Sequence, residues 1–295
     1  MENNDLSSKN FEKGATHVKD ISYFDKSREW VKALQEKARK EEEELLETGF
    51  VNLPSWREDR RGVPNSLIRC ALFAAIQSKD REYLQEVSVF SQKGFTVTYT
   101  GKQLNQEDLT VWLALVDLMK KDPLGTECRF TAHEILKYMD LGTSIDAYER
   151  LRCSILRMTA CAVVIEAEKY TYGKNLIESF FIDRDTNKYK VTLSRHLIKL
   201  FGENDWTAVN WDERKQLKHK PLCLKFHDYY SSHQEPLPVS FEFLFGIAGS
   251  VNKQKAGFKI KAKNAFEELV KINFLREYSI EAEMVKVKRN KNSTK

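Results

Sequence analysis

The sequence predicts an α+β protein in which one order of elements occurs twice: helix, short helix, turn, longer helix and β-hairpin. Helical apolar spacing and short β-branched runs alternate within residues 95–193, and the same order returns within residues 221–288 without sequence identity between the two parts. The length of 295 residues, with 41% hydrophobic and 31% charged residues, suffices for about two domains. These values exclude a disulfide mini-protein, a collagen-like fibre and a wholly disordered chain.

Residues 1–64 are predicted to be an N-terminal extension that is partly helical or disordered. Ser27–Glu47 has one narrow apolar stripe followed by an acidic run, which predicts a single helix. One such stripe cannot build a core alone, so this helix must dock on another element or stay mobile. Pro54 and Pro64 then mark a basic link into the folded part.

The first set of elements is predicted within residues 65–205. A capping box at Thr131 opens a short helix that ends near Gly142, and a second cap at Thr143 or Ser144 opens a longer one. The other elements expected here are a strand at Phe95–Thr100, a helix at Leu109–Lys121, strands at Val163–Glu168 and Leu176–Asp183 that pair through a turn at Gly173–Asn175, and a strand at Lys188–Leu193.

The second set is predicted within residues 206–295. It consists of helices at Pro221–His233, Val239–Gly246 and Asn252–Ile272, followed by strands at Leu275–Ile280 and Met284–Lys288. Each set has the order of a winged helix, a helix-turn-helix whose second helix enters a major groove while a β-hairpin touches the backbone nearby. We therefore expect two tandem winged-helix domains, with the main DNA-binding surface in the second.

The positive charge of the chain is concentrated at its C-terminal end. The net charge is +5, but residues 252–295 alone contain twelve Lys or Arg and five Glu, so the rest of the chain is slightly negative. Such clustering is typical of a polyanion-binding surface. On charge alone, a solvated lysine face kept for solubility is an equally good explanation.

The predicted helix Asn252–Ile272 favours a polyanion-binding surface over a solvated lysine face. On a helical wheel one arc is apolar, and it comprises Phe258, Ala262, Ala265, Phe266 and Leu269. The opposite arc and its edges are basic, and the first acidic residue, Glu267, arrives only after about four turns. Because the dipole at a helix N-terminus also attracts anions, the pattern predicts a recognition helix that faces DNA.

The residue types suggest separate roles on this surface. Lysines suit phosphate, and those expected to contact it are Lys253, Lys255, Lys259, Lys261 and Lys263 on the helix, with Lys286, Lys288 and Arg289 on the second wing. Asn252 and Gln254 are the candidates for base edges, because amides pair bidentately with adenine. Binding should weaken steeply with salt.

The corresponding helix of the first set, Ser144–Thr159, is less one-sided. It carries Arg150, Arg152 and Arg157, but Asp146 and Glu149 lie among them. We include Arg150 and Arg157 as candidate DNA contacts. A partner or dimer surface, or an ordinary mixed-charge face, explains this helix equally well.

Catalytic motifs are not evident, so the sequence predicts a binding protein and not an enzyme. Tyr229-Tyr230 resembles paired nicking tyrosines, but they lie on an apolar helix face and no His-hydrophobic-His metal motif accompanies them. His219, Cys223 and His227 are poorly placed for one metal ion, and no phosphate-binding loop of the GxxxxGK[ST] type occurs, so no cofactor is expected. Five dispersed cysteines, no signal peptide and no membrane helix predict a cytoplasmic protein.

A set of short residue runs occurs in an order typical of one protein family. They are Pro64-Asn65, Ala71-Leu72-Phe73, Tyr99-Thr-Gly101, Val111-Trp112, Pro123-Leu-Gly125, Glu134-Ile-Leu136, Leu200-Phe-Gly202, Trp211 and, most specific, Asp228-Tyr-Tyr-Ser-Ser-His233-Gln-Glu-Pro236-Leu-Pro238. With these runs, the sequence resembles the TrfA family of plasmid replication initiators over roughly residues 54–290. The resemblance implies binding of direct repeats (iterons) at a plasmid origin through two winged-helix domains. It also implies monomeric binding, inactive dimers, melting of an AT-rich segment, and recruitment of the host initiator, helicase and sliding clamp.

Clamp binding lacks its usual motif in this chain. Better-known family members carry a Gln-Leu-x-Leu-Phe type peptide, whereas the aligned stretch here, Glu47–Asn52, has neither the glutamine nor the spaced leucines. A winged-helix transcriptional regulator remains the alternative to an initiator, and a nicking replication enzyme is a more distant one. The first would not sustain plasmid replication, and the second would form a covalent adduct with DNA through a tyrosine.

Overall fold

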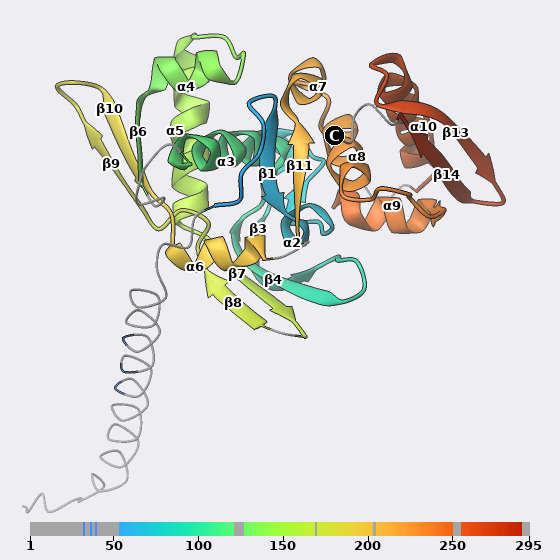
Figure 1. Cartoon of the computed structure of the whole chain (residues 1–295), viewed down its shortest axis with the longest axis horizontal. Coiled ribbons are helices and arrows are strands. Elements are labelled where there is room, and N and C mark those ends of the chain that lie inside the picture. The colour runs from blue at the N-terminus through green and yellow to red at the C-terminus, as the bar shows by residue number, and fades with distance from the viewer. Residues whose placement is uncertain are drawn as a thin grey trace, which may run out of the picture. The chain divides into compact units, whose positions relative to one another are not determined.

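The computed structural model describes residues 53–120, 127–168, 170–202, 205–249 and 255–290, together with Lys32, Glu36 and Arg39. These three residues are helical, and the rest of the predicted helix Ser27–Glu47 lies outside the described residues. Residues 52–295 form one compact unit of mixed helices and strands (Figure 1). Within it, one buried cluster runs from Trp56 to Trp211 and a second from Leu217 to Val287.

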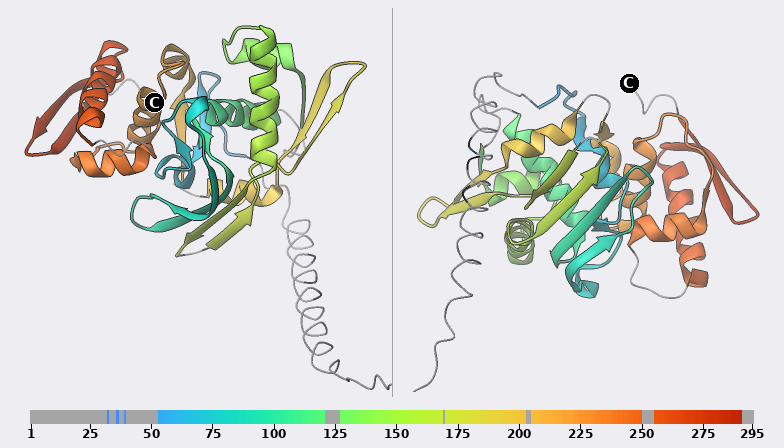
Figure 2. Two further views of the ribbon diagram at one scale, coloured as in Figure 1. Left: turned by 180° about the vertical axis from the view of Figure 1, so that it is seen from behind. Right: turned by 90° about the horizontal axis from the view of Figure 1, so that it is seen from below.

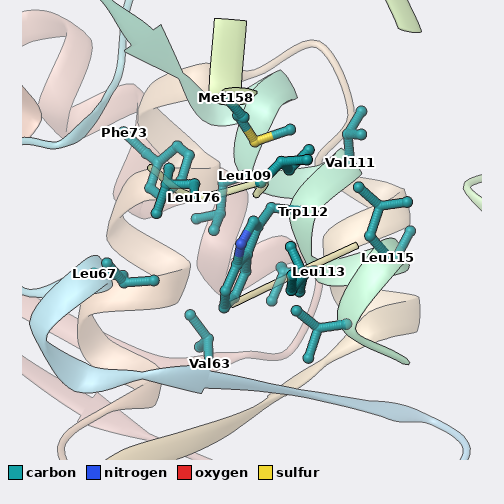
Figure 3. Packing of buried hydrophobic residues seen from close by; sticks show 14 of the residues in the cluster. Val63, Leu67, Phe73, Leu109, Val111, Trp112, Leu113, Leu115, Met158 and Leu176 are labelled. Carbon is teal, nitrogen blue, oxygen red and sulfur yellow. The ribbon is translucent and has the colours of Figure 1, made fainter. Parts of the chain in front are cut away.

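Helix α3 (Gln106–Met119) is the centre of the first half. Its N-terminus has a capping box in which the Asn105 side chain accepts from the Asp108 backbone and the Asp108 side chain accepts from the Asn105 backbone. Trp112 on this helix is fully buried, and Figure 3 shows it among Val63, Leu67 and Leu113. Truncation of a buried tryptophan costs about 3–5 kcal/mol, so this contact contributes a large part of the stability of the first half.

The remaining elements of the first half surround α3. They are β1 (Arg60–Pro64), α2 (Asn65–Ile68), β2 (Phe73–Ala74), η1 (Ser78–Asp80), β3 (Tyr83–Val89), β4 (Phe95–Lys102), β5 (Leu104–Asn105), β6 (Glu127–Thr131), α4 (Ala132–Tyr138), α5 (Ile145–Thr159), β7 (Ala162–Ala167), β8 (Tyr170–Lys174), β9 (Ser179–Asp183), β10 (Lys188–Thr192), α6 (Arg195–Ile198), η2 (Lys199–Phe201), β11 (Trp206–Asn210) and α7 (Trp211–Gln216). The predicted capping box at Thr131 is confirmed, and Ser144 is the N-cap of α5. The predicted strand at Phe95–Thr100 is β4.

The predicted pairing of the strands after α5 is wrong. Strand β7 pairs with β4 and β8, in a four-stranded sheet of order β3-β4-β7-β8, so the turn follows Ala167 and not Gly173. Strand β9 pairs instead with β10, in a sheet of order β6-β10-β9. The reason is non-local: Val163 and Ile165 of β7 are fully buried on β4, whose partner residues precede them by more than sixty positions.

The second half repeats part of the element order of the first: a strand, a short helix, a longer helix and a hairpin, without the strands β7 and β8 that precede the hairpin in the first half. It consists of α8 (Pro221–Ser231), β12 (Val239–Ser240), α9 (Phe241–Ala248), α10 (Lys255–Lys271), β13 (Leu275–Glu281) and β14 (Met284–Arg289). Its sheet order, β12-β14-β13, matches β6-β10-β9, because in both halves the strand before the short helix pairs with the last strand of the hairpin. The predicted hairpin of β13 and β14 is confirmed, and Ala282 and Glu283 at its turn have positive φ.

The two halves are joined through α8. Lys225 on this helix is completely buried, and its Nζ donates to the backbone carbonyls of Ile68 and Cys70 in the first half. Arg214 of α7 pairs with Asp228 of α8 and also donates to the Thr110 hydroxyl on α3 at 2.9 Å. A buried charge that loses its partner is costly. Separation of the two halves would leave Lys225 and Arg214 without these partners, so the contacts hold the halves together.

Candidate nucleic-acid interface

Helix α10 buries the face that its sequence predicts. Phe258, Ala262, Ala265, Phe266 and Leu269 are all buried, and the Phe266 ring stacks on Phe226 of α8 with centroids 4.9 Å apart. The described part of the helix begins at Lys255, of which only the backbone is described. Asn252, Lys253 and Gln254 lie outside the described residues.

The outward face of α10 presents unpaired cations around an exposed apolar residue. Lys261 and Lys263 are exposed and make no ion pair with the residues that the structure describes. Ile260 has 65% of its surface exposed, although isoleucine is usually buried. Asn264 is exposed beside it, and a Cβ at Gly257 would meet no atom within 4 Å. This face therefore offers positive charge, one amide and room for close approach.

Lys259, also on this helix, contacts a carboxylate. Its Nζ lies 2.6 Å from Glu283 at the tip of the second wing and 5.8 Å from the centre of the Phe241 ring. Both partners of the ion pair are largely exposed, and such pairs are worth about 0–1 kcal/mol. A phosphate group can therefore compete with Glu283 for Lys259.

The three basic residues predicted on the second wing differ in their surroundings. Lys286 is exposed and makes no ion pair with the described residues, whereas Lys288 pairs with Glu277 on the neighbouring strand at 2.5 Å. Arg289 points inward, donates to the carbonyl of His233 at 2.9 Å and lies over the Phe274 ring. Desolvation lowers its pKa to about 10. Arg289 therefore holds the end of α8 and is not presented to a ligand of the wing.

In the first half, α5 presents little free charge. Arg152 makes a two-pronged bond to Glu149, with N–O distances of 2.7 and 3.0 Å, and this bond lowers the pKa of Glu149 to about 2. Arg157 lies 2.7 Å from Asp108, a completely buried carboxylate on α3 that also binds Arg81. Arg157 is therefore an internal residue, and Arg150 alone of the two candidates is exposed.

Helices α5 and α10 are both in view when the molecule is seen from behind (Figure 2, left), and a cleft lies beside each of them. One has a volume of about 470 Å³ and is lined by Arg150, His219 and Lys79. The other, of about 620 Å³, is lined by Lys261 and Asn264 of α10. Gln77, next to η1, lines both clefts, so they adjoin there. Glu107 also lines the first cleft, and Asp80 and Glu268 line the second, so both linings are of mixed charge.

The sequence interpretation missed Ile260, Asn264 and Lys79 at this surface. Ile260 was detectable, because it lies opposite the apolar arc of α10, where a purely structural helix would carry a polar residue. Lys79 had no local signal, since η1 reaches the surface between the helices only through the tertiary fold.

Groups suited to catalysis are buried or dispersed in the part of the chain that the structure describes. No cluster of three His, Cys, Asp or Glu residues suited to a metal ion occurs there. His227 is completely buried and lies 2.8 Å from Glu213. Burial raises the pKa of Tyr229 to about 12 and that of Tyr230 still further, which suppresses their phenolate forms. None of the described helices is long and apolar enough to cross a bilayer.

Comparison with known proteins shows the family to which the chain belongs. The family model of the TrfA protein matches residues 21–289, nearly the whole sequence. The chain belongs to the TrfA family. A curated relative is the plasmid replication initiator protein TrfA of Escherichia coli, to which this TrfA-family chain is 28% identical over 243 residues. The match covers 79% of this chain and 63% of the relative, so the relative extends well beyond the shared region.

Two groups of solved structures resemble this TrfA-family protein at lower similarity. Domains 2 and 3 of RctB have 14% identity and a TM-score of 0.48, over 76% of this chain and 96% of that one. The Pi initiator protein, solved in complex with iteron DNA, has 15% identity and a TM-score of 0.47, over 62% of this chain and 89% of that one.

Proposed function

We propose that this TrfA-family protein is a plasmid replication initiator that binds direct repeats at an origin, helps to melt the adjoining duplex and recruits host replication proteins. The exposed face of α10, on which Lys261 and Lys263 make no ion pair with any described carboxylate, is the observation that carries the DNA-binding part. The name of the E. coli relative supports the role in replication. Plasmid replication takes place in the cytoplasm, and we assign the protein to that compartment.

We further propose that each half is a winged-helix domain, divided as residues 65–205 and 206–295. The shared element order and the shared sheet order of β6-β10-β9 and β12-β14-β13 support this assignment. In this arrangement α5 and α10 are the two recognition helices. The second domain is the main DNA-binding surface, because Lys261, Lys263 and Lys286, which have no ion-pair partner in the described part of the chain, lie there.

The proposed contacts follow the exposure of each residue. Phosphate contacts fall to Lys261, Lys263 and Lys286, with Lys259 and Lys288 joining when phosphate displaces their carboxylate partners. Arg150 and Lys79 extend the surface toward the first half. Asn252, Lys253, Gln254 and Lys255 remain predictions for the start of the helix. Arg157 and Arg289 are left out of the proposal, because both are half-buried and already bonded to groups of the protein itself.

The test is replication of a plasmid that carries the direct repeats next to this gene and lacks its own initiator. The protein should sustain that plasmid, whereas a transcriptional regulator would bind the repeats without rescue. Duplex binding should weaken with salt, with a log–log slope of about −0.9 per phosphate neutralised. Lys93→Gln, at an exposed lysine in the β3–β4 turn, is the control for substitutions of Lys261 and Lys263, and it should leave duplex binding unchanged.

We propose a non-catalytic role, in contrast to a nicking enzyme. Tyr229 and Tyr230 lie in the buried aromatic cluster of the second half, with ring centroids 5.1 Å apart. If the protein only binds, replacement of both by Phe should cause a mild change in packing and leave repeat binding intact. A covalent protein–DNA adduct that is lost in the double Phe variant would instead support nicking.

A further inference from the structure

Three residues on the outward face of α10 do nothing for the stability of the helix itself. Gly257 weakens a helix interior, and neither a positive φ nor a close neighbour requires a glycine there. Ile260 leaves 65% of its surface exposed to water. Asn264 is exposed and makes no hydrogen bond with the described residues, and asparagine favours a helix less than most polar residues do. These residues therefore suit a role in contact with another molecule.

The three residues lie on one uncharged stripe with a lysine on each side. At about 100° per residue, Asn264 and Gly257 lie about 40° and 60° to one side of Ile260. Lys261 lies farther round on that side, at about 100°, and Lys263 lies at about 60° on the other side. Both lysines are exposed and make no ion pair with a described carboxylate.

This arrangement fits the major groove of B-DNA. A helix with its side chains is about 10–12 Å across, and the groove is about 12 Å wide with a phosphate backbone along each edge. A helix in that groove directs its central stripe at the base edges and its two flanks at the phosphates. Glu267, an exposed carboxylate two turns after Ile260, would be repelled by phosphate, so the contact ends before it.

The chemistry of the stripe selects A·T pairs. The amide of Asn264 can bind the N7 and N6 atoms of adenine together, and an apolar side chain such as Ile260 finds its partner in the thymine methyl group. We propose that Asn264 contacts an adenine and Ile260 a thymine of the repeat, an assignment that rests on the proposed function. Four residues of helix span about 6 Å and base pairs are about 3.4 Å apart, so the two bases lie within about two base pairs of each other.

Fluorescence anisotropy with the duplex repeat that lies next to this gene tests the assignment. In one set of duplexes each adenine in turn is replaced by 7-deazaadenine, which lacks N7, and in a second set each thymine is replaced by deoxyuridine, which lacks the methyl group. The native protein should bind at least one duplex of each set about five- to tenfold more weakly than the unmodified repeat. Asn264→Ala should weaken binding of the unmodified repeat by about tenfold and remove the penalty at one adenine. Ile260→Ala should remove the penalty at one thymine within about two base pairs of that adenine.

Gln85→Ala, at an exposed amide of β3, is the matched control and should keep both the affinity and the penalties. Asn264→Ala should fold normally, because the side chain it removes is exposed and has no partner among the described residues. Full affinity in Asn264→Ala would overturn the proposal, as would a loss of affinity with every analogue penalty retained, or a separation of more than about two base pairs. If the native protein still distinguishes the repeat from an unrelated duplex, such a result leaves the proposed function standing. Failure to bind the repeat at all would overturn both.

Discussion

Helices α5 and α10 occupy the same place in the same order of elements, but their outward faces differ. On α5, Arg152 pairs with Glu149, and Arg157 pairs with the buried carboxylate of Asp108. On α10, Lys261 and Lys263 have no carboxylate partner among the described residues. Under the proposed function, the fold supplies a helix that can enter a groove in each half, and the pairing of the charges on that helix decides whether it attracts DNA.

The largest effect is expected inside the first half. Asp108→Asn leaves Arg81 and Arg157 without their buried partner and weakens the capping box of α3, so unfolding should become easier by about 3–5 kcal/mol. Thermal or urea unfolding measures this change, with Asp185→Asn at an exposed turn as the control. Equal stability of the two variants would mean that Arg157 is not held as described and is available as a DNA contact.

The next effect concerns the charge of α10. Reversal of Lys261 and Lys263 to Glu should lower affinity for duplex repeats by about 100-fold at physiological salt, because two attractive charges become repulsive. The matched reversal on α5, Arg152→Glu, should change affinity by less than about threefold, since that guanidinium already binds Glu149. Fluorescence anisotropy at several salt concentrations measures both. Similar losses in the two helices would remove the contrast between the halves.

A smaller effect is expected from the apolar centre of the α10 face. Ile260→Ala should weaken repeat binding by about five- to tenfold, because an exposed apolar side chain in a major groove contacts thymine methyl groups. Replacement of thymine by deoxyuridine in the repeat should weaken the native protein and have little further effect on the variant. Leu156→Ala on α5, where the side chain is 45% exposed, is the matched comparison and should change affinity little.

The smallest effect is the acid titration of the α5 pair. The bond to Arg152 holds the pKa of Glu149 near 2 in the folded protein, below the usual value of about 4.3. Any stability from this pair is therefore present above that usual value and is lost as the pH falls through about 2. Carbon NMR of the Glu149 carboxyl should follow this titration, and Glu149→Gln should leave DNA affinity within about twofold. An unshifted carboxyl would show that Arg152 is free for DNA.

Local signals in the sequence predicted local structure well. The capping box at Thr131 and the buried arc of α10 depend on residues three or four positions apart, and the structure agrees with both. Pairings between distant segments were not predictable in this way. Arg157 binds Asp108, 49 residues away in the sequence, and Arg289 binds His233, 56 residues away. The residues next to each arginine in the sequence therefore do not show that its guanidinium is already paired. The pairing of β7 with β4 was missed for the same reason.

The buried lysine of α8 limits how far α5 and α10 can move relative to each other. Lys225 of the second half donates hydrogen bonds to the carbonyls of Ile68 and Cys70 in the first half. Because these bonds hold the two halves together, the distance between α5 and α10 cannot adjust freely to a DNA site. If Arg150 of α5 and the lysines of α10 both contact a repeat, as proposed above, their two contact sites must lie at one fixed helical phase. An insertion of about five base pairs between them would turn one site to the far side of the duplex, since a helical turn takes 10–10.5 base pairs.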